Sequence, residues 1–159
     1  MTQLDFYHIT KSTTKQTLEK LLARAIADGG INNIILANSA NHAQRLSAML
    51  WENDDPTLFL ANCIYDNEDN SVNATINPPI CITHHLNATI TGQFLFILSS
   101  NNHNDIMMTE FSRVFILFMG NNDNELNMAR SLWQQHKKLT KRYFQQDNTQ
   151  GKWSLKISE

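Results

Sequence analysis

Residues 111–119 are almost continuously apolar, and they constrain the fold more than any other part of the chain. A strand has this composition when both of its faces are buried, as happens when helices cover the two sides of a parallel sheet. The segment therefore predicts a central strand of a parallel or mainly parallel sheet.

Shorter apolar segments alternate with stretches of helical periodicity along the rest of the chain. Strands are predicted at residues 4–9, 31–37, 79–83, 93–98, 142–146 and 152–157. Helices are predicted from about residue 13 to the Gly29-Gly30 pair, at 39–51, at 104–110 and at 123–140, while residues 52–77 are irregular. This alternation predicts an open, mainly parallel, Rossmann-like α/β sheet flanked by helices. We expect a single domain over residues 1–159.

Local signals mark the ends of the first two long helices. Thr13 and Gln16 have the spacing of a capping box, and Gly29-Gly30 can end the helix that Thr13 begins. Asn38 or Ser39 can cap the second helix. Its apolar stripe comprises Ala43, Leu46, Met49 and Leu50.

Motifs for nucleotide or metal chemistry are missing from the sequence. Five glycines form neither a G-x-G-x-x-G fingerprint nor a Gly-Lys-Ser/Thr loop, so no phosphate-binding loop and no cofactor are expected. His84-His85 are adjacent, and on a strand their side chains would point to opposite faces. Cys63 and Cys81 lack metal-ligand spacing and suggest unpaired thiols in a reducing compartment. Neither a signal peptide nor a membrane span is indicated, so a cytoplasmic location is expected.

Positive charge is concentrated at the C-terminal end. Residues 126–159 contain seven basic and two acidic side chains, a charge of +5 within a chain of net charge −2. If the last helix extends to residue 140, Arg130, Lys137 and Lys141 line one arc beside the apolar face, with Trp133 at the border. This arrangement favours an anionic partner with an apolar part. The alternative is that Trp133 belongs to the core and that the bases form a solvated face.

Several segments resemble a known family when they are taken in order. They are Asp5-Phe6-Tyr7-His8-Ile9, Ala48-Met49-Leu50-Trp51, Phe59-Leu60, the apolar strand at 111–118, Ala129-Arg130-Ser131-Leu132-Trp133 and Gly151-Lys152-Trp153. Each motif alone is weak, but the order and spacing resemble the chi subunits of bacterial DNA polymerase III holoenzyme over nearly the whole chain. The resemblance implies a non-enzymatic replication adaptor associated with the clamp loader.

The resemblance also implies a site for the acidic, phenylalanine-ended C-terminal tail of single-stranded-DNA-binding protein. Arg130 matches the tail-binding arginine of the family, Trp133 an aromatic residue one turn later, and Phe118 an apolar pocket residue. The flanking lysines of the best-known members fall here on Leu126 and Gln134. Lys137, Lys138 and Lys141 are the candidates to supply that charge instead.

A second surface is implied near Trp51, Phe59 and Leu60, where some members bind the psi subunit. We therefore expect a monomer or a heterodimer that contacts DNA only indirectly. Two other classes remain open at this point. The basic C-terminal segment could bind nucleic acid directly, and the α/β sheet could carry a small-molecule enzyme, although the missing glycine loop places the enzyme last.

Overall fold

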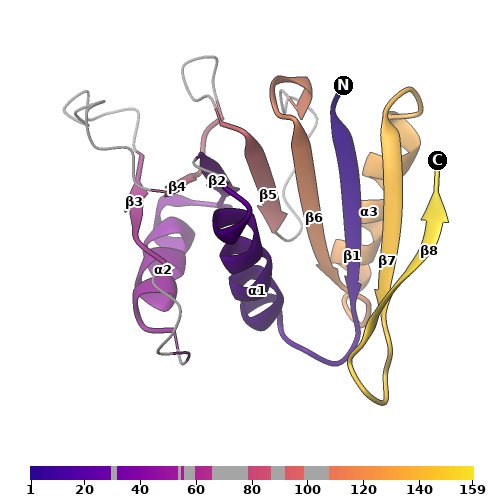
Figure 1. Cartoon of the computed structure of the whole chain (residues 1–159), viewed down its shortest axis with the longest axis horizontal. Helices are drawn as coiled ribbons and strands as arrows, with labels where there is room; N and C mark the ends of the chain where they lie inside the picture. The colour runs from indigo at the N-terminus through magenta and orange to yellow at the C-terminus, as the bar shows by residue number, and fades with distance from the viewer. Residues whose placement is uncertain (30–31, 54, 56–59, 66–78, 87–91, 99–107) are drawn as a thin grey trace.

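The computed structural model shows one open sheet with helices on both faces (Figure 1), and it describes residues 1–29, 32–53, 55, 60–65, 79–86, 92–98 and 108–159. The strands have the order β3-β4-β2-β5-β6-β1-β7-β8. All described pairings are parallel except that of β7 with β8. The mainly parallel α/β fold is confirmed. Its elements are β1 Gln3–Ile9, α1 Thr14–Ala27, β2 Asn33–Leu36, α2 Ala40–Trp51, β3 Asn62–Ile64, β4 Ile80–Thr83, β5 Phe94–Leu98, the 3₁₀ helix η1 Met108–Glu110, β6 Arg113–Met119, α3 Asp123–Gln135, β7 Thr140–Gln146 and β8 Trp153–Ser158.

The apolar segment forms β6, which lies between β5 and β1 in the middle of the sheet. Its five central residues are buried. Phe115 and Leu117 pack with α1 and α2 on one face, while Ile116 and Phe118 pack with α3 on the other. The prediction of a strand buried on both sides is confirmed, and the two faces of the sheet carry separate hydrophobic clusters.

The predicted helix ends agree with the structure at several positions. Thr13 and Gln16 form the capping box of α1, and Ser39 caps α2 by accepting a hydrogen bond from the amide of His42. After α1, Gly29 adopts a φ of 90°, a conformation that disfavours residues with a Cβ. Gly30 lies outside the described residues.

Three elements differ from the sequence prediction. The helix predicted at 104–110 is a 3₁₀ helix over Met108–Glu110, and residues 104–107 lie outside the described residues. The strand β3 lies within a segment expected to be irregular, and it pairs with β4 so that Cys63 faces Cys81 in register, both thiols being free. The last helix ends at Gln135 rather than at residue 140, because residues 140–145 instead pair with β1. Leu139 and Tyr143 continue the apolar periodicity of α3, but they lie in the turn and in β7.

The adjacent histidines also differ from their prediction. His84 and His85 follow the end of β4 in a bend, where their ring centroids are 4.2 Å apart, so they do not point to opposite faces of a strand. Within the described part of the chain, no group of three or more His, Cys, Asp or Glu side chains could hold a metal ion.

A buried carboxylate on β1 joins this strand to its two neighbours in the sheet, β6 and β7. Asp5 on β1 is fully buried and accepts hydrogen bonds from Arg113 on β6 and from Arg142 on β7. Both bonds from Arg142 measure 2.8 Å, and Gln3 donates a further bond of 2.8 Å. Burial raises the pKa of Asp5, but these hydrogen bonds and the nearby arginine charges outweigh it, and the net pKa is lowered.

Candidate functional site

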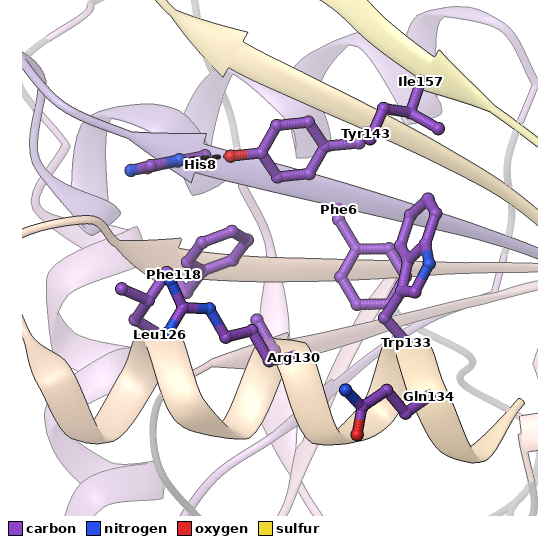
Figure 2. A pocket seen from close by; sticks show the side chains of 10 residues that line it. Phe6, His8, Phe118, Leu126, Arg130, Trp133, Gln134, Tyr143 and Ile157 are labelled. Carbon is purple, nitrogen blue, oxygen red and sulfur yellow. Dashed lines mark hydrogen bonds between the residues drawn. The ribbon is translucent and has the colours of Figure 1, made fainter.

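A pocket of about 370 Å³ opens between α3 and the sheet face that α3 covers (Figure 2). We call it the α3 pocket. It is a size at which small ligands and single large side chains are bound. Residues from β1, β6, α3, β7 and β8 line it: Phe6, His8, Phe118, Leu126, Ala129, Arg130, Trp133, Gln134, Tyr143 and Ile157.

The interior of the α3 pocket is mostly aromatic. The Trp133 ring meets Phe6 edge-on, with centroids 5.0 Å apart, and it is nearly perpendicular to the Tyr143 ring at 6.4 Å. Trp133 is half-buried, so it packs on the core and also forms a wall of the pocket. Phe118 is 1% exposed and contributes to the floor. Rings in these edge-on arrangements create an apolar hollow suited to another ring.

Arg130 is the cation at the edge of this hollow. It is exposed on α3, and it forms no ion pair with any residue in the described part of the chain. In Figure 2 its side chain extends along α3 toward Phe118 and Leu126. Burial raises the pKa of Tyr143, and the positive charge of Arg130 acts against that rise. The guanidinium is therefore close enough for its charge to act on a residue of the pocket wall. An unpaired guanidinium beside an apolar hollow can bind a carboxylate with two parallel hydrogen bonds.

His8 completes the wall opposite α3. Its Nδ1 atom shares a hydrogen bond with the Tyr143 hydroxyl, and its ring stacks on Phe118 at 5.1 Å. Burial lowers the pKa of His8, which favours the neutral imidazole. Gly120 permits this position, because a Cβ there would lie only 1.9 Å from His8 Nε2. The wall of the pocket therefore depends on a close backbone approach that glycine allows.

The structure brings three of the predicted tail-binding residues together, since Arg130, Trp133 and Phe118 all line the α3 pocket. Leu126 and Gln134, which replace the flanking lysines of the best-known family members, line it as well. Whether these residues bind a tail stays a prediction. Sequence reasoning missed Phe6, His8, Tyr143 and Ile157. Alternation along β1 places Phe6 and His8 on one face, but no local signal showed that α3 covers this face.

The alignment of Lys137 and Lys141 with Arg130 along one helix is wrong, because α3 ends before them. Lys137 is exposed in the turn after α3. Lys141 lies in β7, and its side chain is only 4% exposed. Its ammonium lies 4.8 Å from the centre of the Trp133 ring, donates to the Trp133 carbonyl at 3.3 Å and pairs with Glu159 at 3.3 Å. Lys141 thus supports Trp133 from behind rather than lining the pocket.

The residues of the predicted second surface differ in their exposure. Trp51 ends α2 with 53% of its surface exposed. Leu60 is 2% exposed and packs in the core on the α1 and α2 face, so its placement on a surface is wrong. Phe59 lies outside the described residues.

None of the helices in the described ranges is long and apolar enough to cross a membrane. Comparison with known proteins gave a match to a family model. No curated protein matched the chain. The family model described as DNA polymerase III chi subunit, HolC, matches residues 1–141, which confirms the resemblance seen in the motifs. The match covers most of the chain and includes β1, β6 and α3, the first three elements of the α3 pocket. The chain therefore belongs to the chi subunit family of DNA polymerase III, whose members are accessory subunits of the replicative polymerase.

Proposed function

We propose that this protein is a cytoplasmic, non-catalytic adaptor that binds the acidic C-terminal tail of single-stranded-DNA-binding protein and links it to the clamp loader. The observation that carries the proposal is the Arg130 guanidinium, which has no ion-pair partner among the described residues and lies at the edge of an aromatic hollow. A chain terminus that ends in phenylalanine offers one ring and one carboxylate in close proximity. The α3 pocket has a complement for each of them.

The aromatic rings and the guanidinium of the α3 pocket have different roles in this complex. Burial of the phenyl ring against Phe6, Phe118 and Trp133 supplies the hydrophobic part, on the order of 2 kcal/mol for a fully buried side chain. Arg130 supplies direction, because its planar fork fixes where the terminal carboxylate lies. Acidic residues that precede the phenylalanine are attracted by the positive charge of the C-terminal segment, which includes exposed Lys137 and Lys138.

Calorimetry with a short acidic peptide ending in Pro-Phe tests the proposal directly. We expect micromolar binding that weakens as salt is added, because much of the attraction is between exposed charges. The same peptide with a C-terminal amide should bind at least about tenfold more weakly, since Arg130 then loses its charged partner. Equal binding of the acid and the amide would contradict the assignment of Arg130.

Direct binding to DNA by the basic C-terminal segment is the competing function. Two of its seven bases form internal ion pairs, Lys141 with Glu159 and Arg142 with Asp5. Fewer free cations remain to neutralise phosphates, and non-specific affinity for DNA depends on their number. The peptide therefore fits the site better than a DNA strand, and an oligonucleotide of ten thymidines is the appropriate competitor in the same calorimetric assay.

We further propose that the end of α2 contacts a second partner, the psi subunit, and through it the clamp loader. The support is the large exposed surface of Trp51 at the last position of the helix. Truncation of a central aromatic residue commonly costs an interface 2 kcal/mol or more. We expect Trp51→Ala to weaken psi binding at least about tenfold in a co-purification titration, while the tail peptide still binds normally. Unchanged psi binding would contradict this placement.

A further inference from the structure

A second groove lies on the opposite face of the sheet, between α1 and the terminal hairpin of β7 and β8. We call it the α1 groove; its volume is about 400 Å³. Tyr7 and Trp153 belong to the hydrophobic cluster beneath α1, whereas Phe6 and Trp133 of the α3 pocket belong to the cluster beneath α3. The lining residues are Tyr7, Ser12, Thr17, Lys20, Leu21, Arg24, Phe144, Gln146, Trp153 and Leu155.

One wall of the α1 groove is positively charged. Lys20 and Arg24 lie one turn apart on α1, and both are exposed. Neither forms an ion pair with a residue in the described ranges, and none of the lining residues is acidic. The nearest acidic side chain on α1, Glu19, is paired with Lys15. An anionic ligand would therefore be complementary in charge to this wall.

The opposite wall is apolar. Leu155 is 52% exposed, and Phe144, Trp153 and Leu21 are half-buried around it. A large hydrophobic side chain left half in water beside other apolar groups is typical of an interaction surface. The ligand therefore needs an apolar side chain as well as negative charge.

The packing of the rings distinguishes a peptide from a nucleic acid. Tyr7 is stacked on Phe144 at 4.9 Å and on Phe115 at 6.1 Å, and Trp153 meets it edge-on at 5.3 Å. Tyr7 is only 8% exposed, so neither of its faces is available to a base. Single-stranded nucleic acid is bound by stacking on open ring faces along a track of cations. Two cations opposite an apolar wall fit an acidic peptide better.

We propose that the α1 groove binds an acidic peptide segment through an internal apolar side chain, which contacts Leu155 and Trp153, while neighbouring carboxylates pair with Lys20 and Arg24. The groove requires no chain terminus, because both cations lie along its wall rather than at a closed end. The hairpin that forms half of the groove lies almost entirely beyond residue 141, where the family match ends. This site is separate from the α3 pocket, and it does not depend on the function proposed above.

Fluorescence anisotropy with a defined probe tests the inference on the full chain. The probe is a dye-labelled octapeptide with blocked ends, in which Leu-Phe is flanked on each side by three acidic residues. We expect saturable binding that Arg24→Glu and Lys20→Glu each weaken by at least about tenfold, because an attraction becomes a repulsion. Arg45→Glu is the matched control, since Arg45 is also exposed on a helix of this face but does not line the groove.

A second variant tests the apolar contact, and two further measurements identify the site. Leu155→Ser should weaken binding several-fold without unfolding the chain, because Leu155 is half exposed. Arg130→Ala should leave binding of this blocked peptide unchanged. The proposal is overturned if the peptide does not bind at millimolar concentration, if Arg130→Ala abolishes binding while Arg24→Glu does not, or if ten thymidines bind in its place with a steep salt dependence.

Discussion

Replacing Arg130 with alanine is expected to weaken binding of the phenylalanine-ended acidic peptide by at least about tenfold. In the proposed complex the guanidinium donates a charged hydrogen bond to the terminal carboxylate, and such bonds contribute about 1.5–3 kcal/mol. The aromatic hollow formed by Phe6, Phe118 and Trp133 remains, so residual binding should be less sensitive to salt than that of the unchanged protein. Calorimetry at two ionic strengths measures both effects.

The control for this experiment is Arg45→Ala. Arg45 is an exposed arginine on α2 and lies outside the α3 pocket, so the two variants lose the same charge from the same kind of position. Thermal unfolding should be nearly unchanged for both, as is usual for exposed side chains. If Arg130→Ala and Arg45→Ala weaken the peptide equally, the effect of Arg130 is only that of net charge, and the site assignment is wrong.

Replacing Asp5 with asparagine is expected to destabilise the protein by about 2–4 kcal/mol. The substitution leaves Arg113 and Arg142 beside a neutral amide, and removal of one partner from a buried pair commonly costs 3–5 kcal/mol. We place the effect somewhat lower because the two arginine side chains are 33% and 31% exposed and keep part of their hydration. Urea unfolding followed by tryptophan fluorescence measures the loss.

Asp28→Asn provides the comparison for Asp5, because Asp28 is exposed at the end of α1. Its replacement should change the free energy of unfolding by less than about 0.5 kcal/mol. A similarly small effect at Asp5 would mean that the network of Asp5 with Arg113 and Arg142 contributes little to holding β6, β1 and β7 together.

The same carboxylate gives the stability a defined pH dependence. The pKa of Asp5 is lower in the folded protein than the ordinary value of 3.8, so the unfolded chain takes up its proton at a higher pH than the folded chain. The contribution of Asp5 is therefore fully present above pH 3.8 and is lost as the pH falls from there through the lowered pKa. In Asp5→Asn this part of the acid sensitivity should be absent.

The sequence predicted those elements whose signals are local. The apolar run identified β6, and the capping box identified the start of α1, because burial on both faces and a local hydrogen-bond pattern leave direct traces in residue type. The end of α3 was predicted wrongly, because Leu139 continues the helical spacing beyond Gln135, although residues 142–146 were correctly predicted as a strand. Pairing of β7 with β1 decides between helix and strand here, and that contact joins residues more than 130 positions apart.

The residues of the candidate site were likewise predicted only in part. Arg130 and Trp133 are close in sequence on one helix, and the family resemblance added Phe118 to them. Lys141 was assigned to the same helix, although it is buried in β7 behind Trp133. His8 and Tyr143 were missed because their contact depends on two strands becoming neighbours. Only the assembled sheet reveals such partners.

The antiparallel pairing of β7 with β8 contains a bulge, which determines which side chains of β8 face each side of the sheet. Tyr143 is paired with Ile157 and Phe144 with Leu155, so the extra residue, Lys156, separates two aliphatic side chains that would otherwise face the same side. Leu155 thus lines the α1 groove and Ile157 lines the α3 pocket. Substitutions made one residue at a time along β8 should therefore affect the α1 groove and the α3 pocket in turn, and the order of this alternation should shift by one residue at Lys156. Deleting Lys156 would restore a regular pairing of β7 with β8 and would leave Leu155 and Ile157 on their present sides of the sheet.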